Sequence, residues 1–212
     1  MKVVPLFPTP LGLIDLGEVH NWQDNKLVDA VFRAQQADPD GDNRSQVGGW
    51  HSHPLSSFDP SFEELCVLVK EYGQTYLQHL GFSNEIQTVD CWANVNKKGN
   101  FNMMHHHNGS LLGGVYYPVR RIENGTRIFN YDVPTTPKPG SWSGEGGELT
   151  LQAPNYNLSG HLDTSDIGAY TMTHCHIQPR SGLLVLFPAH LVHSVVPVQD
   201  DYTRVSIAFS FV

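Results

Sequence analysis

Charged residues and cysteines are both scarce in this sequence. Asp, Glu, Lys and Arg make up 16% of its 212 residues, against about 25% in an average globular protein. The formal net charge is −8, so the chain has no basic excess for binding nucleic acid, and we expect no nucleic-acid partner. The three cysteines, Cys66, Cys91 and Cys175, are widely scattered, which argues against a disulfide framework and against a cysteine-based zinc site.

Long hydrophobic runs are missing as well. The first sixteen residues carry one lysine, and Pro5, Pro8 and Pro10 interrupt their apolar run, which is not typical of a signal peptide. No stretch approaches the roughly 20 apolar residues of a membrane helix. We therefore expect a cytoplasmic protein with no membrane contact. The length predicts one domain over residues 1–212.

Hydrophobic periodicity divides the chain into a helical part, about 21–80, and a β part, about 86–212. Apolar residues recur at helical spacing over 25–37 and 60–80, with Ser61 and Glu64 at the spacing of a capping box, while 37–59 reads as loop. The β part alternates in eight short segments, which is typical of a jelly roll with two buttressing helices. These segments are 89–95, 111–119, 127–131, 148–151, 170–177, 183–187, 192–196 and 203–212.

Three consecutive histidines lie inside the segment GNFNMMHHHNGSLLGGVYYPV, residues 99–119. Expression tags usually lie at a terminus, so a tag is a poor explanation. In a strand, His105 and His107 share a face and lie about 6.6 Å apart, which suits two ligands of one metal, and His106 points the other way. Ordinary solvated loop histidines are the alternative reading of this pattern.

The C-terminal segment adds His193 and a basic residue on a hydrophobic strand. The sequence QDDY, residues 199–202, predicts a hairpin turn between the strand of His193 and the last strand. Such a hairpin would place Arg204 on the face of His193, about 13 Å nearer the turn, with Ser206 on that face too. Val205, Ile207 and Phe209 would face away. A buried arginine near a metal ligand needs an anion, and a dicarboxylate fits.

This combination of His-x-His, a distal histidine and Arg-x-Ser resembles the double-stranded β-helix oxygenases that use Fe(II) and 2-oxoglutarate. It is most similar to a poorly characterised group of them. The matching segments are LFPTP (6–10), WANVNKKGNFNMMHHHNGSLLGGVYYP (92–118), SGLLVLFPAHLVHSVVP (181–197) and TRVSIAFSF (203–211). The resemblance implies a mainly β fold, Fe(II), 2-oxoglutarate and O₂ as cofactors, and oxidation of a substrate with release of succinate and CO₂.

The resemblance also implies roles for particular residues. His105, His107 and His193 would be the metal ligands, and Arg204 would bind the distal carboxylate of 2-oxoglutarate, with Ser206 beside it. The remaining residues expected to line the cosubstrate pocket are Asn94, Asn96, Asn102 and Tyr117. Turn chemistry is the alternative for the asparagines. No catalytic residue is expected beyond the metal site.

Position 107 departs from the family pattern. The usual triad is two histidines and one carboxylate, whereas this chain has His107 where most such enzymes have Asp. Three neutral imidazoles leave one more positive charge on the site, which would change the behaviour of iron or favour zinc or nickel. Asp132 or Asp166 could supply a carboxylate from the long central loop.

The sequence is also compatible with two other functions. A cupin-like enzyme could bind metal through three histidines without 2-oxoglutarate, and a non-catalytic binding module could keep the same barrel. Trp50, His51 and His53 read as a surface-loop cluster, with the pocket rim or a partner surface as alternatives. Trp92 and Tyr116 read as core. The sequence leaves the substrate, a small molecule or a peptide, unidentified, and a homodimer stays open.

Overall fold

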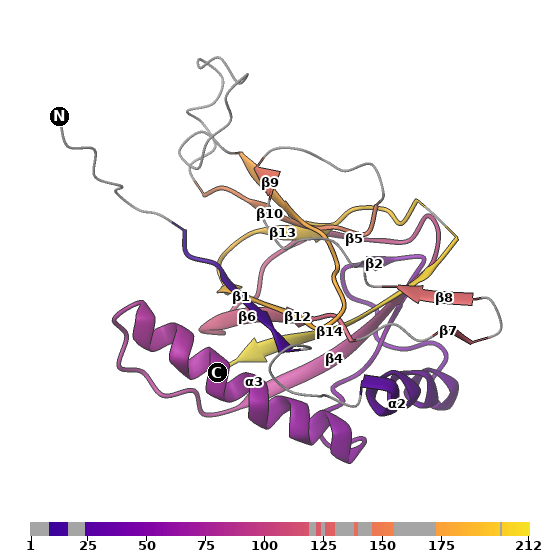
Figure 1. The fold of residues 1–212 in the computed structure, drawn as a ribbon, viewed down its shortest axis with the longest axis horizontal. Helices are drawn as coiled ribbons and strands as arrows, with labels where there is room; N and C mark the ends of the chain where they lie inside the picture. Colours follow the sequence, from indigo (N-terminus) through magenta and orange to yellow (C-terminus); the bar gives the residue numbers. More distant parts are fainter. Residues whose placement is uncertain are drawn as a thin grey trace.

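The computed structural model describes residues 9–16, 24–118, 122–123, 126–129, 138–139, 146–154, 173–199 and 201–212. Two mainly antiparallel sheets face each other, and two helices lie against one of them (Figure 1). The predicted mainly β jelly roll with two helices is confirmed. Neither helix in the described part of the chain combines the length and the apolar run that crossing a membrane requires.

The larger, eight-stranded sheet carries the helices. Its main path runs β1 (Gly12–Asp15), β12 (Leu183–Pro188), β6 (Leu112–Tyr116), β14 (Thr203–Phe211), β4 (Val89–Asn96) and β3 (Trp50–His51). Beside this path, β8 (Thr126–Phe129) pairs in parallel with β14, and β7 (Ile122–Glu123) pairs with β8. The longest strands, β4 and β14, therefore lie side by side near the middle.

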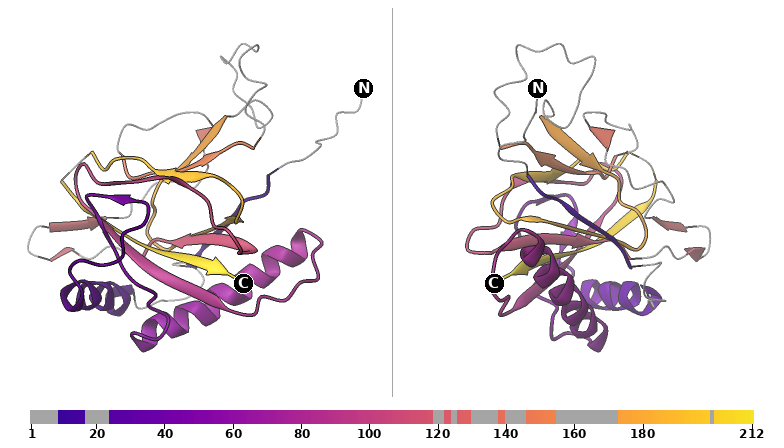
Figure 2. Two further views of the ribbon diagram at one scale, coloured as in Figure 1. Left: turned by 180° about the vertical axis from the view of Figure 1, so that it is seen from behind. Right: turned by 60° about the vertical axis from the view of Figure 1, so that its left-hand side comes forward.

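The smaller sheet forms the opposite wall of the barrel (Figures 1 and 2). Its order is β2 (Gln46–Val47), β5 (Phe101–His105), β13 (His193–Val195), β10 (Leu149–Gln152), β11 (His174–Ile177) and β9 (Lys138–Pro139). The strands of His105 and His193 are neighbours in this sheet. Both candidate ligands thus lie on one wall, facing β4 and β14.

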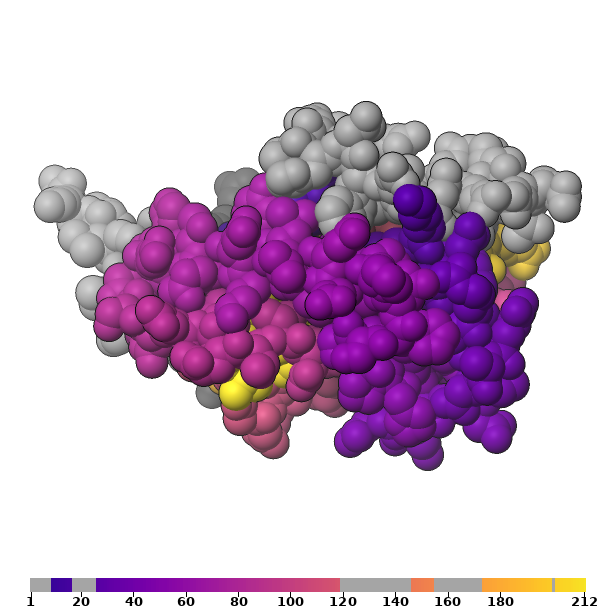
Figure 3. Space-filling view, turned by 90° about the horizontal axis from the view of Figure 1, so that it is seen from below, coloured from indigo at the N-terminus to yellow at the C-terminus, as the bar shows by residue number. Residues whose placement is uncertain are grey.

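The helices are α2 (Asp24–Ala37) and α3 (Pro60–His79), and their residues make up much of the outer face of the molecule in Figure 3. Asp59 is the N-cap of α3, and its carboxylate accepts a hydrogen bond from the Ser61 backbone at 3.0 Å. The predicted capping box at Ser61 is therefore wrong by two residues. Pro60, which suits the first turn because its ring fixes φ, begins the helix instead.

Strand β14 separates a hydrophobic core from the barrel interior. Val205, Ile207, Phe209 and Phe211 are fully buried among residues of α2 and α3, as the alternation predicts. A second cluster of buried apolar side chains, including Val115 and Leu149, fills part of the space between the sheets. The even-numbered residues of β14 face that interior, which positions polar side chains inside the barrel.

The predicted hairpin between the last two strands is wrong. β13 pairs with β10 and β5, whereas β14 pairs with β4, β6 and β8. The chain therefore crosses from one sheet to the other after β13. All eight predicted strands are present in their described parts. Residues 37–59 are not simply loop, because they contain β2 and β3. The strands β1, β5, β7 and β9 were not predicted either.

Candidate metal centre and cavity

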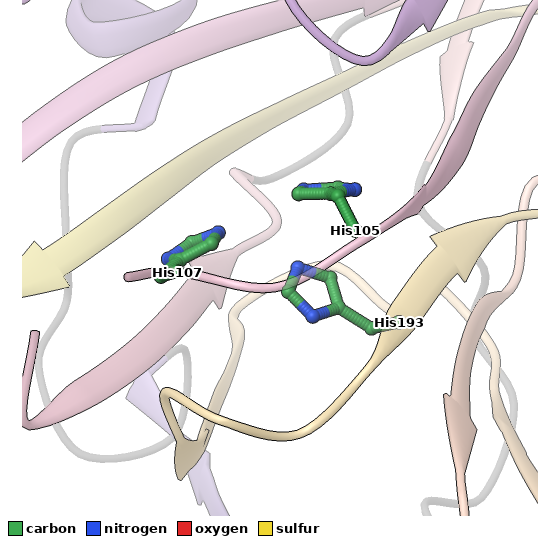
Figure 4. Close-up of side chains that lie close together, drawn as sticks. All are labelled: His105, His107 and His193. Carbon is green, nitrogen blue, oxygen red and sulfur yellow. The ribbon is translucent and has the colours of Figure 1, made fainter. Parts of the chain in front are cut away.

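Three histidine rings meet between the two sheets (Figure 4). His105 ends β5, His107 follows two residues later, and His193 begins β13, where it is paired with His105. One ring nitrogen of each lies within 4.8 Å of the others. The ring centroids are 4.3 Å apart for His105 and His193, 5.0 Å for His107 and His193, and 5.6 Å for His105 and His107.

Backbone carbonyls orient two of these rings. Nδ1 of His105 lies 2.8 Å from the carbonyl oxygen of Met103, and Nδ1 of His193 lies 2.8 Å from that of Leu191. A carbonyl only accepts, so each Nδ1 carries the proton and each Nε2 keeps its lone pair for a metal. His107 donates its backbone N–H to the carbonyl of Ala189 at 3.0 Å, and its buried Nδ1 has no hydrogen-bond partner among the described residues.

Burial keeps the three imidazoles neutral. Desolvation lowers the pKa of His193 to about 3 and that of His107 to about 4, and it also lowers the pKa of His105. The neighbouring histidines act in the same direction, since each ring disfavours a positive charge on the others. Neutral imidazole is the form that binds metals, so the cluster is in the ligand state at neutral pH.

We expect the metal-free protein to lose stability as the pH falls from about 7.5 to about 5. The unfolded chain protonates its histidines near pH 6.5, whereas folded His107 and His193 stay neutral down to about 4 and about 3. Their contribution is present above pH 6.5 and is lost as the pH falls toward those values, about 1–2 kcal/mol per ring at pH 5. Urea unfolding at several pH values measures this loss in the free energy of unfolding.

The matched variants for this pH dependence are His193→Gln and His79→Gln. The first removes one buried titrating ring and should flatten the dependence, whereas His79 is exposed on α3 and its substitution should leave the slope unchanged. Equal slopes in all three proteins would contradict the assignment.

A β-bulge turns His105 inward. His193 is paired with His105 and Val195 with Asn102, so β5 has one residue more than β13 between these two pairs. Asn102 and His105 are three positions apart and would face opposite sides of a regular strand, yet both line the same cavity. The residues of the bulge, Met103 and Met104, are 51% and 58% exposed. Bulges commonly re-aim side chains beside functional sites.

Arg204 lies on the opposite wall and is 1% exposed. Its Nε donates to the carbonyl oxygen of Gly147 at 2.9 Å, Nη1 to the hydroxyl of Ser206 at 2.8 Å and Nη2 to the hydroxyl of Tyr117 at 3.4 Å. No carboxylate among the described residues forms an ion pair with it. A guanidinium has five N–H donors and a permanent charge, so this buried group retains the capacity to bind an anion.

The structure brings together most of the predicted cosubstrate residues. Asn94, Asn102, Arg204 and Ser206 line one cavity of about 610 Å³ with the three histidines. Asn96 and Tyr117 are fully buried beside this cavity and are not among the residues that line it. Asn96 donates to the side-chain oxygen of Asn102 at 3.1 Å, and the Tyr117 ring lies 5.2 Å from the Arg204 guanidinium carbon. Both residues position other side chains.

Two cavity residues were misread from the sequence. Trp92 is not core: it is half-buried, lines the cavity and lies 5.5 Å, ring to ring, from His107. His51 is not on a surface loop, because it is buried in β3, lines the cavity and stacks on Trp92 at 5.9 Å. The alternation of side chains along β4 could have identified Trp92 as a cavity residue, because Trp92 and Asn94 are two positions apart and share a face. Tyr116 is core, as predicted.

The other predicted loop and carboxylate residues lie outside the cavity or outside the described residues. Trp50 is buried, and His53 is exposed and lies 3.7 Å from a carboxylate oxygen of Asp38. Asp132 and Asp166, the predicted sources of a carboxylate, lie outside the described residues. Within the described ranges, the ligand cluster consists of histidines alone.

Comparison with known proteins connects this geometry to a family. The family model 2OG-FeII_Oxy_5, described as "Putative 2OG-Fe(II) oxygenase", matches residues 90–210, more than half of the chain. That match includes the three histidines, Arg204 and all but one residue of each long strand, β4 and β14. None of the curated proteins that were compared with the chain matches it.

Several solved structures share the fold. A prolyl-4-hydroxylase from Pseudomonas putida aligns with a TM-score of 0.59 at 13% identity, over 96% of this chain and 92% of that one. HygX from Streptomyces hygroscopicus, solved with nickel and 2-oxoglutarate bound, aligns with a TM-score of 0.55 at 13% identity, over 96% of this chain and 83% of that one. The viral collagen prolyl hydroxylase of Paramecium bursaria Chlorella virus-1 aligns with a TM-score of 0.51 at 15% identity, over 95% of this chain and 94% of that one.

At these identities the structural likeness establishes the jelly-roll fold, and the family match covers the strands that carry the histidines and the arginine. The chain therefore belongs to the 2OG-Fe(II) oxygenase family, an oxidoreductase family that uses Fe(II), 2-oxoglutarate and O₂.

Proposed function

We propose that His105, His107 and His193 hold the Fe(II) of this 2-oxoglutarate-dependent oxygenase and that Arg204 holds the distal carboxylate of 2-oxoglutarate. One observation carries the proposal: a buried arginine without an ion-paired carboxylate among the described residues lines the same cavity as three converging imidazoles. The metal and the dicarboxylate thus have separate binding groups on opposite walls.

The residues present fit a divalent metal. Nε2 of His105 and of His193 is left available by the hydrogen bonds at Nδ1, and the buried Nδ1 of His107 has no partner among the described residues. Burial keeps the imidazoles neutral, so binding a metal does not require the loss of protons at neutral pH.

The residues also fit a dicarboxylate. Arg204 is held in place through Gly147 and Ser206, so little side-chain entropy is lost when an anion binds it. Asn94 on the wall of Arg204 and Asn102 on the wall of the histidines add amide groups to the same cavity. A dicarboxylate held by Arg204 at one end and by a metal on the histidines at the other would bridge the two sheets.

When bound, iron and 2-oxoglutarate together supply the oxidising chemistry, in which O₂ is consumed and succinate and CO₂ are released. This chain's own residues position the components. Arg204 fixes the far carboxylate, the histidines fix the metal, and buried side chains such as Val115 and Phe187 exclude water from one side of the cavity.

We expect anaerobic addition of Fe(II) and then 2-oxoglutarate to give a weak visible charge-transfer band. The band requires the keto acid and the metal to be in contact, so it reports both binding sites at once. Stoichiometric metal binding without a band would contradict the 2-oxoglutarate assignment, and failure to retain any metal would favour a binding module. Succinate release in air is the matching activity measurement.

A cupin-like metalloenzyme that does not use 2-oxoglutarate is the second candidate. The observation that favours it is the ligand cluster itself, which contains three histidines and no carboxylate within the described residues. Such an enzyme has no dicarboxylate to hold, which leaves Arg204 unexplained. Substrate oxidation without succinate release would identify it.

A further inference from the structure

The cavity becomes more exposed along one direction. On the interior face of the large sheet, Arg204 is paired with Asn96, Ser206 with Asn94, Ala208 with Trp92 and Ser210 with Asp90. The first two pairs are buried. In the third, both residues are half-buried, and in the fourth Ser210 is half-buried and Asp90 is exposed. Successive pairs are about 7 Å apart along the strands.

This gradient separates a closed half from an open half. The proposed 2-oxoglutarate site occupies the closed half, between Arg204 and the histidines. The open half begins at Trp92, whose ring is 5.5 Å from that of His107, and it ends at Asp90. A substrate that enters over Asp90 and Trp92 therefore reaches the histidines from the end of the cavity opposite Arg204.

The charged groups of the open half favour a cation. Among the described residues that line the cavity, the arginines are Arg44 and Arg204. Arg204 is at the closed end, and Arg44 is bound to Asp42 at 2.8 Å. Asp90 forms no ion pair with a described residue. The open half thus carries one carboxylate that no basic side chain neutralises.

The aromatic residues of the open half point to the same chemistry. The face of an indole attracts cations, and Trp92 is oriented by stacking against His51, with ring planes 20° apart. Burial lowers the pKa of His51, so this ring does not add a positive charge beside Trp92 at neutral pH. Ala208, opposite Trp92, has a small side chain that leaves room for a ligand.

We propose that the open half binds a substrate bearing a cationic nitrogen, an ammonium or guanidinium group held between Trp92 and Asp90. This inference rests on the proposed function, because the substrate is defined by its position beside the metal. In the hydroxylation that follows, one C–H bond becomes C–OH. One oxygen atom of O₂ enters the substrate and the other enters succinate, with CO₂ released from 2-oxoglutarate.

The test uses the full chain loaded with Fe(II) and 2-oxoglutarate without oxygen. The probes are three pairs in which only the first member carries a cationic nitrogen: agmatine and N-butylurea, n-butylammonium and n-butanol, and a blocked peptide with one central arginine and its citrulline counterpart. Perturbation of the charge-transfer band measures binding, and succinate release in air measures coupled turnover. A response to the small amines indicates that the substrate is a small-molecule cation, and a response to the peptide alone indicates that it is a protein side chain.

We expect at least one cationic probe to bind about fivefold to tenfold more tightly than its neutral partner. Asp90→Asn should remove most of that preference, and Trp92→Leu should weaken binding of the cation more than of its neutral partner. Glu85→Gln, which removes an exposed carboxylate outside the cavity, should keep the preference.

Equal binding of cationic and neutral probes, no binding of any cation, or a full preference in Asp90→Asn would overturn the inference. These outcomes are distinct from failure of the proposed function, because the wild-type band with 2-oxoglutarate alone reports that function before any probe is added.

Discussion

Arg204→Ala is expected to abolish 2-oxoglutarate-dependent turnover while the protein still binds its metal. The guanidinium is 1% exposed and is the one buried cation among the described residues that line the cavity. Loss of one partner from a buried charge pair costs about 2–5 kcal/mol, which is roughly a 30- to 4,000-fold loss of affinity. Titration of the charge-transfer band with 2-oxoglutarate measures this loss directly.

The conservative and control variants make the Arg204 result specific. Arg204→Lys keeps a charge but loses the planar donors that bind Ser206 and Gly147, so we expect an intermediate affinity for 2-oxoglutarate. Arg33→Ala removes an exposed arginine outside the cavity and should leave the affinity unchanged. Metal content and far-UV circular dichroism identify misfolding. Wild-type affinity in Arg204→Ala would remove this residue from the site.

His193→Ala is expected to reduce Fe(II) affinity by about 100-fold or more. Substitution of groups that only orient metal ligands already costs about 10- to 100-fold, so loss of a ligand should cost at least as much. We expect a similar loss of Fe(II) affinity in His105→Ala. His106→Ala is the matched control, because His106 is exposed, bonds to Asn108 at 2.9 Å and is not part of the ligand cluster. Metal retained after dialysis against a weak chelator measures the effect.

Position 107 tests the all-histidine ligand set separately. If His107 binds the metal, His107→Asp should retain it, because a carboxylate ligand at this position completes the usual triad of the family, whereas His107→Ala should lose it. Equal metal content in both variants would show that His107 is not a ligand. The same pair also tests whether the third imidazole changes succinate release.

Local periodicity explains how much of this protein could be predicted from its sequence. Alternation depends only on neighbouring residues, so the eight predicted strands and the outward faces of Val205, Ile207 and Phe209 agree with the structure. The His-x-His spacing predicted that His105 and His107 lie together, and the family resemblance implied His193 as the third ligand; the structure brings the three side chains together.

The tertiary structure alone decided the features that depend on strand pairing. Sequence cannot show which sheet a strand joins, and β14 lies beside β4 rather than β13. Arg204 still reaches the interior because the two sheets face each other. The bulge in β5, which turns Asn102 and His105 to one side, results from pairing with β13.

The sequence by itself thus determined the fold class, the family and the candidate ligands, because each of them depends on local residue patterns and short motifs. The cavity was decided by the packing of two sheets, which placed Trp92 and His51 beside His107 and set Asp90 at the open end. These contacts join residues far apart in the chain, so no local spacing encodes them.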